Sequence, residues 1–129
     1  MGNRAVVTVK GSSTGVYLHW NGGKESVNGF LRAAKDLGVR APSGDTSYFY
    51  ARFIQIVGNF FGGALSVGVD SLDNLDTDNG DNGTFIVDSN FKIIEHRHSR
   101  SREYDQAYED NVYKMAMEAN ESIFRRKSE

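Results

Sequence analysis

Two valine-rich runs separated by a stretch of small residues open the chain. The runs span residues 4–10 and 16–20, and Gly11-Ser12-Ser13-Thr14-Gly15 lies between them. β-Branched residues favour strands, and glycine and serine favour turns. The pattern therefore predicts an opening β-hairpin.

Two segments with helical spacing follow the hairpin. Apolar residues recur every three or four positions between residues 24 and 38, which predicts a helix that Gly38 ends. Asp45 is a suitable N-cap for a second helix, which runs to about Gly58. This second segment is apolar on more than one face, so we expect it to be buried against a sheet.

The second half of the chain returns to strand-like patterns before a last helix. Residues 64–69 predict a third strand, and residues 84–87 and 91–97 predict a second hairpin. From Glu103 onward the spacing predicts a long helix with one apolar stripe. The stripe comprises Tyr104, Tyr108, Val112, Met115, Ala119 and Ile123.

The order of these elements has no regular alternation of strand and helix. It predicts an α+β fold, with an antiparallel or mixed sheet of about five strands and three helices packed mainly on one face. A length of 129 residues fits a single domain, residues 1–129.

Composition narrows the classes of function. The 15 basic and 17 acidic residues give a formal charge of -2, so we expect no unspecific nucleic-acid binding. Cysteine is absent, which excludes disulfides, thiolate zinc sites and cysteine nucleophiles. No apolar run reaches the length of a membrane span, and the start does not resemble a signal peptide. We expect a soluble protein of the cytoplasm.

The turn between the second strand and the first helix is a candidate anion site. Here Asn21-Gly22-Gly23-Lys24-Glu25-Ser26 leads from a strand into a helix. Backbone amides at a helix start attract phosphate, and Lys24 and Ser26 would add a charge and a hydroxyl. The alternative is that the glycines serve backbone geometry alone. The aromatic residues Trp20 and Tyr48 flank such segments and are our candidates for stacking on a base or a partner.

The segment Asn21-Gly22-Gly23-Lys24-Glu25-Ser26 resembles the phosphate-binding loop of the PP-loop ATP pyrophosphatases, whose pattern is Ser-Gly-Gly-x-Asp-Ser. Gly22, Gly23 and Ser26 agree with that pattern, whereas Asn21 and Glu25 stand in place of its serine and aspartate. The resemblance implies an ATP-binding enzyme that splits ATP between its α and β phosphates.

An acidic segment, residues 70–83, carries five aspartates and no basic residue. Its candidate partner-binding residues are Asp73, Asp76, Asp78 and Asp81, and Asp70 opens it. A solvated loop, weak calcium binding and mimicry of nucleic-acid phosphates remain alternatives. The EF-hand spacing is not met: counted from Asp76, Asp81 and Val87 stand at the glycine and glutamate positions. Counted from Asp78, Gly83 fits, but Gly80 replaces a ligand and Ser89 replaces the glutamate.

The end of the second hairpin combines histidines with arginines. His96 and His98 lie two positions apart on a predicted strand, so we expect them on one face, where two imidazoles could meet a metal. The arginines favour a basic patch for phosphates or an acidic protein surface instead. Its residues are Arg97, Arg100 and Arg102. We assign no metal ligand, no cofactor and no catalytic residue.

Over most of its length the chain resembles small, largely uncharacterised proteins of phages and other mobile elements. The resemblance is carried by Asn3-Arg4-Ala5-Val6, Tyr17-Leu18-His19-Trp20-Asn21-Gly22-Gly23, Val57-Gly58-Asn59-Phe60-Phe61-Gly62-Gly63 and Asp78-Asn79-Gly80-Asp81-Asn82-Gly83. It implies a non-enzymatic, anti-CRISPR-like binding protein that counteracts host immunity. Such a protein would sequester a nucleotide second messenger or mask a CRISPR-type host defence protein. The PP-loop enzyme is the alternative, and a homo-oligomer stays open.

Overall fold

Five strands and three main helices form the part of the chain that the computed structural model describes, which is residues 3–63, 66–98 and 103–125. The strands are β1 (Ala5–Val9), β2 (Thr14–Leu18), β3 (Val67–Ser71), β4 (Thr84–Val87) and β5 (Ile93–Arg97). The helices are α1 (Lys24–Asp36), α2 (Thr46–Phe61) and α3 (Gln106–Arg125), with a short 3-10 helix, η1 (Leu72–Asn74).

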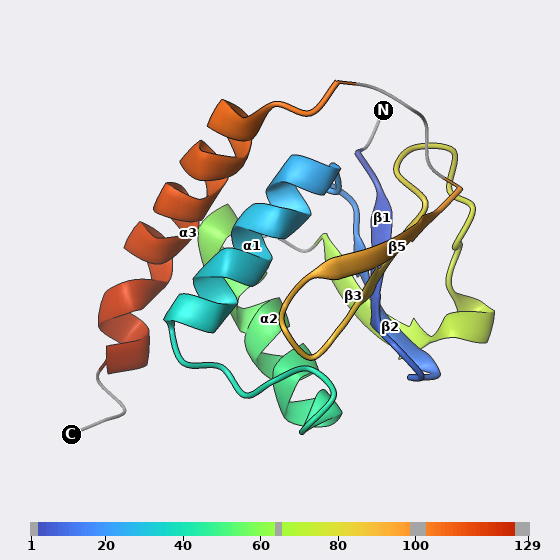
Figure 1. Ribbon diagram of the computed structural model, residues 1–129, viewed down its shortest axis with the longest axis horizontal. Helices are drawn as coiled ribbons and strands as arrows, with labels where there is room; N and C mark the ends of the chain where they lie inside the picture. Colours follow the sequence, from blue (N-terminus) through green and yellow to red (C-terminus); the bar gives the residue numbers. More distant parts are fainter. Residues whose placement is uncertain (1–2, 64–65, 99–102, 126–129) are drawn as a thin grey trace.

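The strands make one mixed sheet in the order β3-β2-β1-β4-β5. The central pair β1 and β4 is parallel, and the other neighbours are antiparallel. The helices lie together on one side of this sheet (Figure 1). The α+β prediction, with a mixed sheet and helices on one face, is confirmed.

The core lies between the sheet and the helices. Alternate β1 residues such as Val7 and Val9 face the helices, where they join Phe30 of α1 and Phe53 of α2 in one fully buried cluster. Burying an aromatic or aliphatic side chain of this size contributes about 1.5–3 kcal/mol relative to leaving it exposed. This layer therefore fixes the helices on the sheet.

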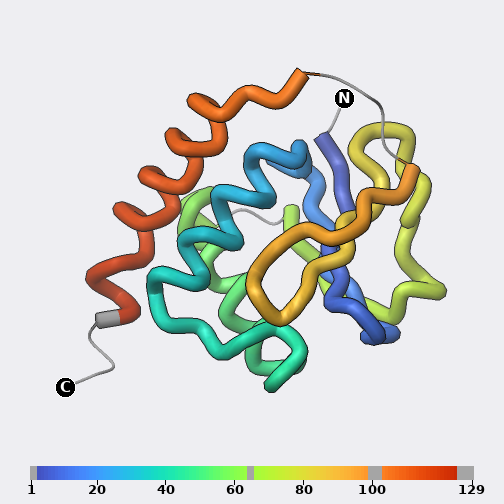
Figure 2. The backbone as a smooth tube through the Cα atoms, in the orientation of Figure 1, coloured from blue at the N-terminus to red at the C-terminus, as the bar shows by residue number. Residues whose placement is uncertain are grey.

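The opposite face of the sheet is covered in part by the acidic segment, which runs along the side away from the helices (Figure 2). Gly15 of β2 lies under this segment, and a Cβ there would come 2.9 Å from Leu72 Cδ2 and 3.1 Å from Leu75 Cδ1. The absent side chain thus makes room for two leucines. They anchor an otherwise polar segment on the sheet.

The second helix differs from the prediction at its end and in how its start is capped. The second helix continues past Gly58 to Phe61 and ends at Gly62, whose φ of 75° is left-handed. Asp45 does stand at its N-cap, but its side chain makes no capping hydrogen bond. Its carboxylate instead accepts from Arg40 Nη1 at 2.8 Å.

The predicted apolar stripe of the last helix coincides only in part with its buried face. Tyr108, Met115 and Ile123 are exposed, whereas Val112 of the stripe is buried together with Glu109, Ala116 and Asn120. Polar residues occupy this face because they find partners there: Arg32 Nη1 donates to Glu109 Oε2 at 2.8 Å, and Asn120 Nδ2 donates to the Ile56 carbonyl at 3.2 Å. A buried face that contains polar residues cannot be predicted from the spacing of apolar residues alone.

Candidate functional site

Asn79 organises the acidic segment from within. Its side chain is buried, with Nδ2 donating to the carbonyls of Asp76 and Gly83, each at 3.1 Å. Its Oδ1 accepts from the amides of Asp81 at 3.2 Å and Gly83 at 3.0 Å. One amide side chain therefore satisfies the backbone groups of a turn that has no regular secondary structure.

Further hydrogen bonds tie the segment to the sheet. Arg4 Nε and the Arg4 amide donate to Asp81 Oδ2 at 2.8 Å and 3.1 Å. Thr84 Oγ1 at the start of β4 donates to the Thr77 carbonyl at 2.9 Å. These bonds fix both the middle and the end of the segment against β1 and β4.

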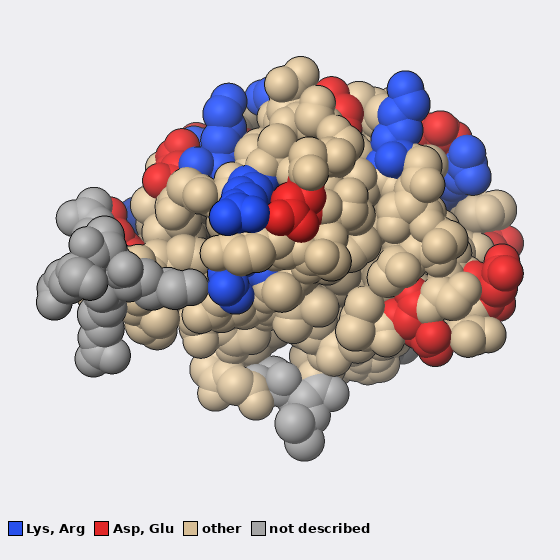
Figure 3. Space-filling view, turned by 90° about the horizontal axis from the view of Figure 1, so that it is seen from below, with Lys and Arg blue, Asp and Glu red and all other residues tan. Residues whose placement is uncertain are grey.

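The remaining carboxylates face solvent. Asp73, Asp76 and Asp78 are exposed, and 71% of the Asp78 side chain is accessible. Figure 3 shows acidic side chains gathered at the end of the molecule that carries this segment. Asp81 differs from them, because it is paired with Arg4. Three of the four predicted partner-binding aspartates therefore face solvent, and the fourth, Asp81, forms an ion pair within the protein.

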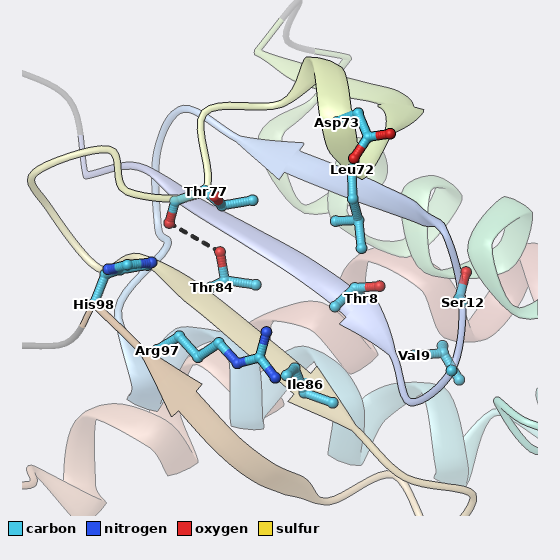
Figure 4. A pocket seen from close by; sticks show the side chains of 11 residues that line it. Thr8, Val9, Ser12, Leu72, Asp73, Thr77, Thr84, Ile86, Arg97 and His98 are labelled. Carbon is cyan, nitrogen blue, oxygen red and sulfur yellow. Dashed lines mark hydrogen bonds between the residues drawn. The ribbon is translucent and has the colours of Figure 1, made fainter.

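A groove of about 400 Å³ separates the acidic segment from the end of β5. Asp73 and Leu72 line one side, and Arg97 reaches into the groove from β5 (Figure 4). Arg97 Nε forms an ion pair with Glu95. The fold thus brings the predicted partner-binding residues Asp73 and Arg97 to one groove, whereas Arg100 and Arg102 lie outside the described residues.

The two histidines of this region do not share a face. His96 lies on β5 with its ring stacked on Phe85 of the core, and its Nε2 lies 2.6 Å from the Asn82 carbonyl oxygen. His98 follows the strand with a φ of 58° and lines the groove near Asp78. The expected common face is therefore wrong. Among the described residues, no group of three or more acidic or histidine side chains could hold a metal ion.

The glycines of the strand-to-helix turn are buried. The Gly22 amide donates to the Asn3 carbonyl at 2.8 Å, and a Cβ at Gly22 would come 2.5 Å from that oxygen. Ser26 is also buried, and its hydroxyl accepts from Asn21 Nδ2 at 3.2 Å. Lys24 is exposed. Close backbone packing is thus a reason for Gly22 that needs no ligand.

Glu25, which stands where the PP-loop pattern has aspartate, is a residue at this turn to which the sequence analysis assigned no role. It is 1% exposed, lies in the first turn of α1 and accepts the Asp105 amide at 2.9 Å through Oε2. A carboxylate at a helix start interacts favourably with the helix dipole. The sequence offered one signal for it, an acidic residue directly after the helix start.

The two aromatic candidates have different surroundings. Trp20 is 43% exposed and meets His19 edge-on, with the ring centroids 4.8 Å apart. Tyr48 has guanidinium groups over its ring, that of Arg40 at 4.6 Å and that of Arg52 at 4.5 Å from the centroid. Trp20 therefore offers the more accessible aromatic surface.

Comparison with family models, with curated proteins and with solved structures gives no match for this chain.

In the part of the chain that the structure describes, no helix combines the length and apolar character needed to cross a membrane. The candidate site is therefore defined by its own geometry: a small α+β domain that holds an acidic segment on one face of its sheet.

Proposed function

We propose that this chain is a non-enzymatic binding protein that masks a basic surface of a partner protein with its acidic segment. The observation that carries the proposal is the fixed backbone beneath exposed carboxylates. Asn79, Thr84 and Arg4 hold the segment, while Asp73, Asp76 and Asp78 face solvent.

Preorganisation makes this arrangement suited to binding. A segment that is already ordered loses less conformational entropy when a partner docks, so more of the interaction energy contributes to affinity. Exposed like charges on such a scaffold favour association with a surface of opposite charge and speed the encounter. Basic residues are absent from residues 70–83, so the segment itself does not neutralise the charge.

The partner class we propose is a nucleic-acid-binding effector of a host defence system, of the CRISPR type. Such effectors hold phosphate backbones with clustered lysines and arginines, which an acidic surface can occupy. The resemblance to proteins of phages and mobile elements supports this choice.

Masking is favoured over capture of a nucleotide at the strand-to-helix turn. The Gly22 amide is already hydrogen-bonded to Asn3, and the buried carboxylate of Glu25 lies in the first turn of α1. A phosphate approaching that turn would meet the carboxyl group of Glu25 and would find the Gly22 amide already bonded.

The test measures DNA binding by purified CRISPR effector complexes in the presence of the protein. Wild type should reduce binding of labelled target DNA, and the effect should weaken at higher salt. The triple variant Asp73→Asn/Asp76→Asn/Asp78→Asn should lose most of it. Glu118→Gln, which removes an exposed charge on α3, is the control and should act like wild type. Equal inhibition by wild type and the triple variant would contradict the proposal.

A further inference from the structure

Strand β3 forms one edge of the sheet, and its pairing defines which backbone groups face outward. β3 pairs with β2 so that Gly68 is opposite Tyr17 and Val69 is opposite Val16. The His19 amide donates to the Ser66 carbonyl at 3.0 Å. Hydrogen-bonded pairs recur at every second residue of an antiparallel ladder, so Gly68 directs its backbone N–H and C=O toward β2, as Ser66 does. The backbone N–H and C=O groups of Val67 and Val69 therefore face away from β2.

This outer edge is accessible. Val69 is 55% exposed, which is high for a valine in a strand. Among the residues that the structure describes, no further strand pairs with β3. An uncovered strand edge is a template for another extended chain, and native proteins usually shield such edges.

Two pockets flank this edge, one on each face of the sheet. On the face away from the helices, a pocket of about 500 Å³ is lined by Tyr17, His19, Trp20 and Gly68. A Cβ built on Gly68 would meet nothing within 4 Å, so this glycine leaves the pocket open. On the helix side, a pocket of about 520 Å³ lies beside Val69 and is lined in part by Tyr50 and Ile54 of α2.

An added strand would place its side chains alternately on these two faces. A residue opposite Val69 would face the helix-side pocket, and a residue opposite Gly68 would face the aromatic pocket. A residue opposite Asp70 would lie beside a carboxylate at the start of the acidic segment. Directly opposed unlike charges stabilise a strand pair, so a basic residue suits that position.

We propose that the edge of β3 binds an extended segment of the partner protein as an additional antiparallel strand. The segment carries a basic, an aliphatic and an aromatic residue in succession, opposite Asp70, Val69 and Gly68. Main-chain hydrogen bonds supply affinity, and the two pockets supply specificity. The identity of the partner rests on the proposed function, because the basic residue continues the contact of the acidic segment.

A second copy of this chain suits the edge less well. In a two-fold antiparallel pair centred on Val69, Asp70 of one copy would lie opposite Gly68 of the other. Its carboxylate would then be desolvated against the aromatic pocket, which is unfavourable without a basic partner.

The test uses a fluorescent peptide with the order Ser-Thr-Lys-Leu-Tyr-Thr-Ser, blocked at both ends, and a scrambled peptide of the same composition. We expect anisotropy to show binding of the first peptide only. Val69→Pro should weaken it at least about tenfold, because proline removes an outward amide and leaves the β2 ladder intact. Val69→Thr keeps that amide and should bind within about threefold of wild type.

Hydrogen exchange provides a second readout. The peptide should protect the amides of Val67 and Val69, while the Gly68 amide is protected with and without it. Equal binding by Val69→Pro and wild type, or no protection at Val67 and Val69, would overturn the proposal. Protection that depends on protein concentration without peptide would assign the edge to a second copy and also overturn it.

The two proposals fail separately in these assays. The triple aspartate variant retains Asp70 and should still bind the peptide, although it no longer masks the effector. Masking without peptide binding would refute the β3 site alone. Peptide binding without masking would refute the proposed function and leave an edge-binding site.

Discussion

The carboxylate of Glu25 in α1 accepts the backbone amide of Asp105, the residue before α3, at 2.9 Å. The Asp105 carboxylate in turn accepts the Tyr108 amide at 3.1 Å and so caps α3. A side chain from the first helix thereby fixes the point at which the last helix begins, although the two residues are 80 positions apart.

Replacing this buried acceptor should destabilise the fold. Glu25→Ala removes the acceptor of the Asp105 amide, and a typical hydrogen bond contributes about 0.5–1.5 kcal/mol to stability. Urea unfolding followed by circular dichroism should show that loss of unfolding free energy. Glu25→Gln keeps an acceptor oxygen and should cost less. Equal losses for the two variants would show that the hydrogen bond is not the stabilising feature.

The fold class was accessible from the sequence because local patterns are strong here. The hairpin of β1 and β2 follows from valine-rich runs around a glycine–serine turn, and Gly38 ends the first helix with a left-handed φ of 85° as expected. These signals depend on neighbouring residues alone.

The buried face of α3 and the internal bonds of the acidic segment were not accessible in this way. Glu109 and Asn120 are buried because Arg32, Ile56 and Asn59 supply partners from distant parts of the chain. In the sequence, Asn79 is an ordinary turn residue. It is buried only because β4 and the acidic segment pack together in the fold. Long-range hydrogen bonds leave no periodicity along the sequence.

Gly22 in the strand-to-helix turn and Gly68 in β3 should respond differently to alanine. At Gly22 a Cβ would lie 2.5 Å from the Asn3 carbonyl oxygen, so Gly22→Ala must displace backbone. We expect a loss of about 1–3 kcal/mol in unfolding free energy, as for other overpacked sites. At Gly68 nothing lies within 4 Å, and Gly68→Ala should change stability by no more than about 0.5 kcal/mol. Thermal unfolding of both variants checks this, and similar melting temperatures would contradict it.

Asn79 should control the order of the acidic segment. Asn79→Ala removes hydrogen bonds to Asp76, Asp81 and Gly83, and we expect a loss of about 1–3 kcal/mol. Amide exchange of Asp81 and Gly83 should accelerate, because their acceptor is gone. Asn74→Ala, at an exposed asparagine earlier in the segment, is the control and should leave these two amides unchanged. Unaltered exchange in Asn79→Ala would show that other contacts order the turn.

The ion pair between Arg32 and Asp110 should lower the pH at which the Asp110 carboxylate becomes protonated. A hydrogen bond from Arg32 Nη1 at 2.7 Å, and secondarily one from Gln106, lowers the pKa of the Asp110 carboxyl below its ordinary value of 3.8. A folded-state pKa below the unfolded value contributes stability that is present at higher pH and is lost as the pH falls through the folded pKa. The Asp110 carboxyl carbon, followed by NMR, should therefore titrate with a midpoint below 3.8. Arg32→Ala should move that midpoint upward, and Gln106→Ala should move it less, since Arg32 is the larger cause. A midpoint that Arg32→Ala leaves in place would show that the guanidinium does not stabilise the ionised carboxylate in solution.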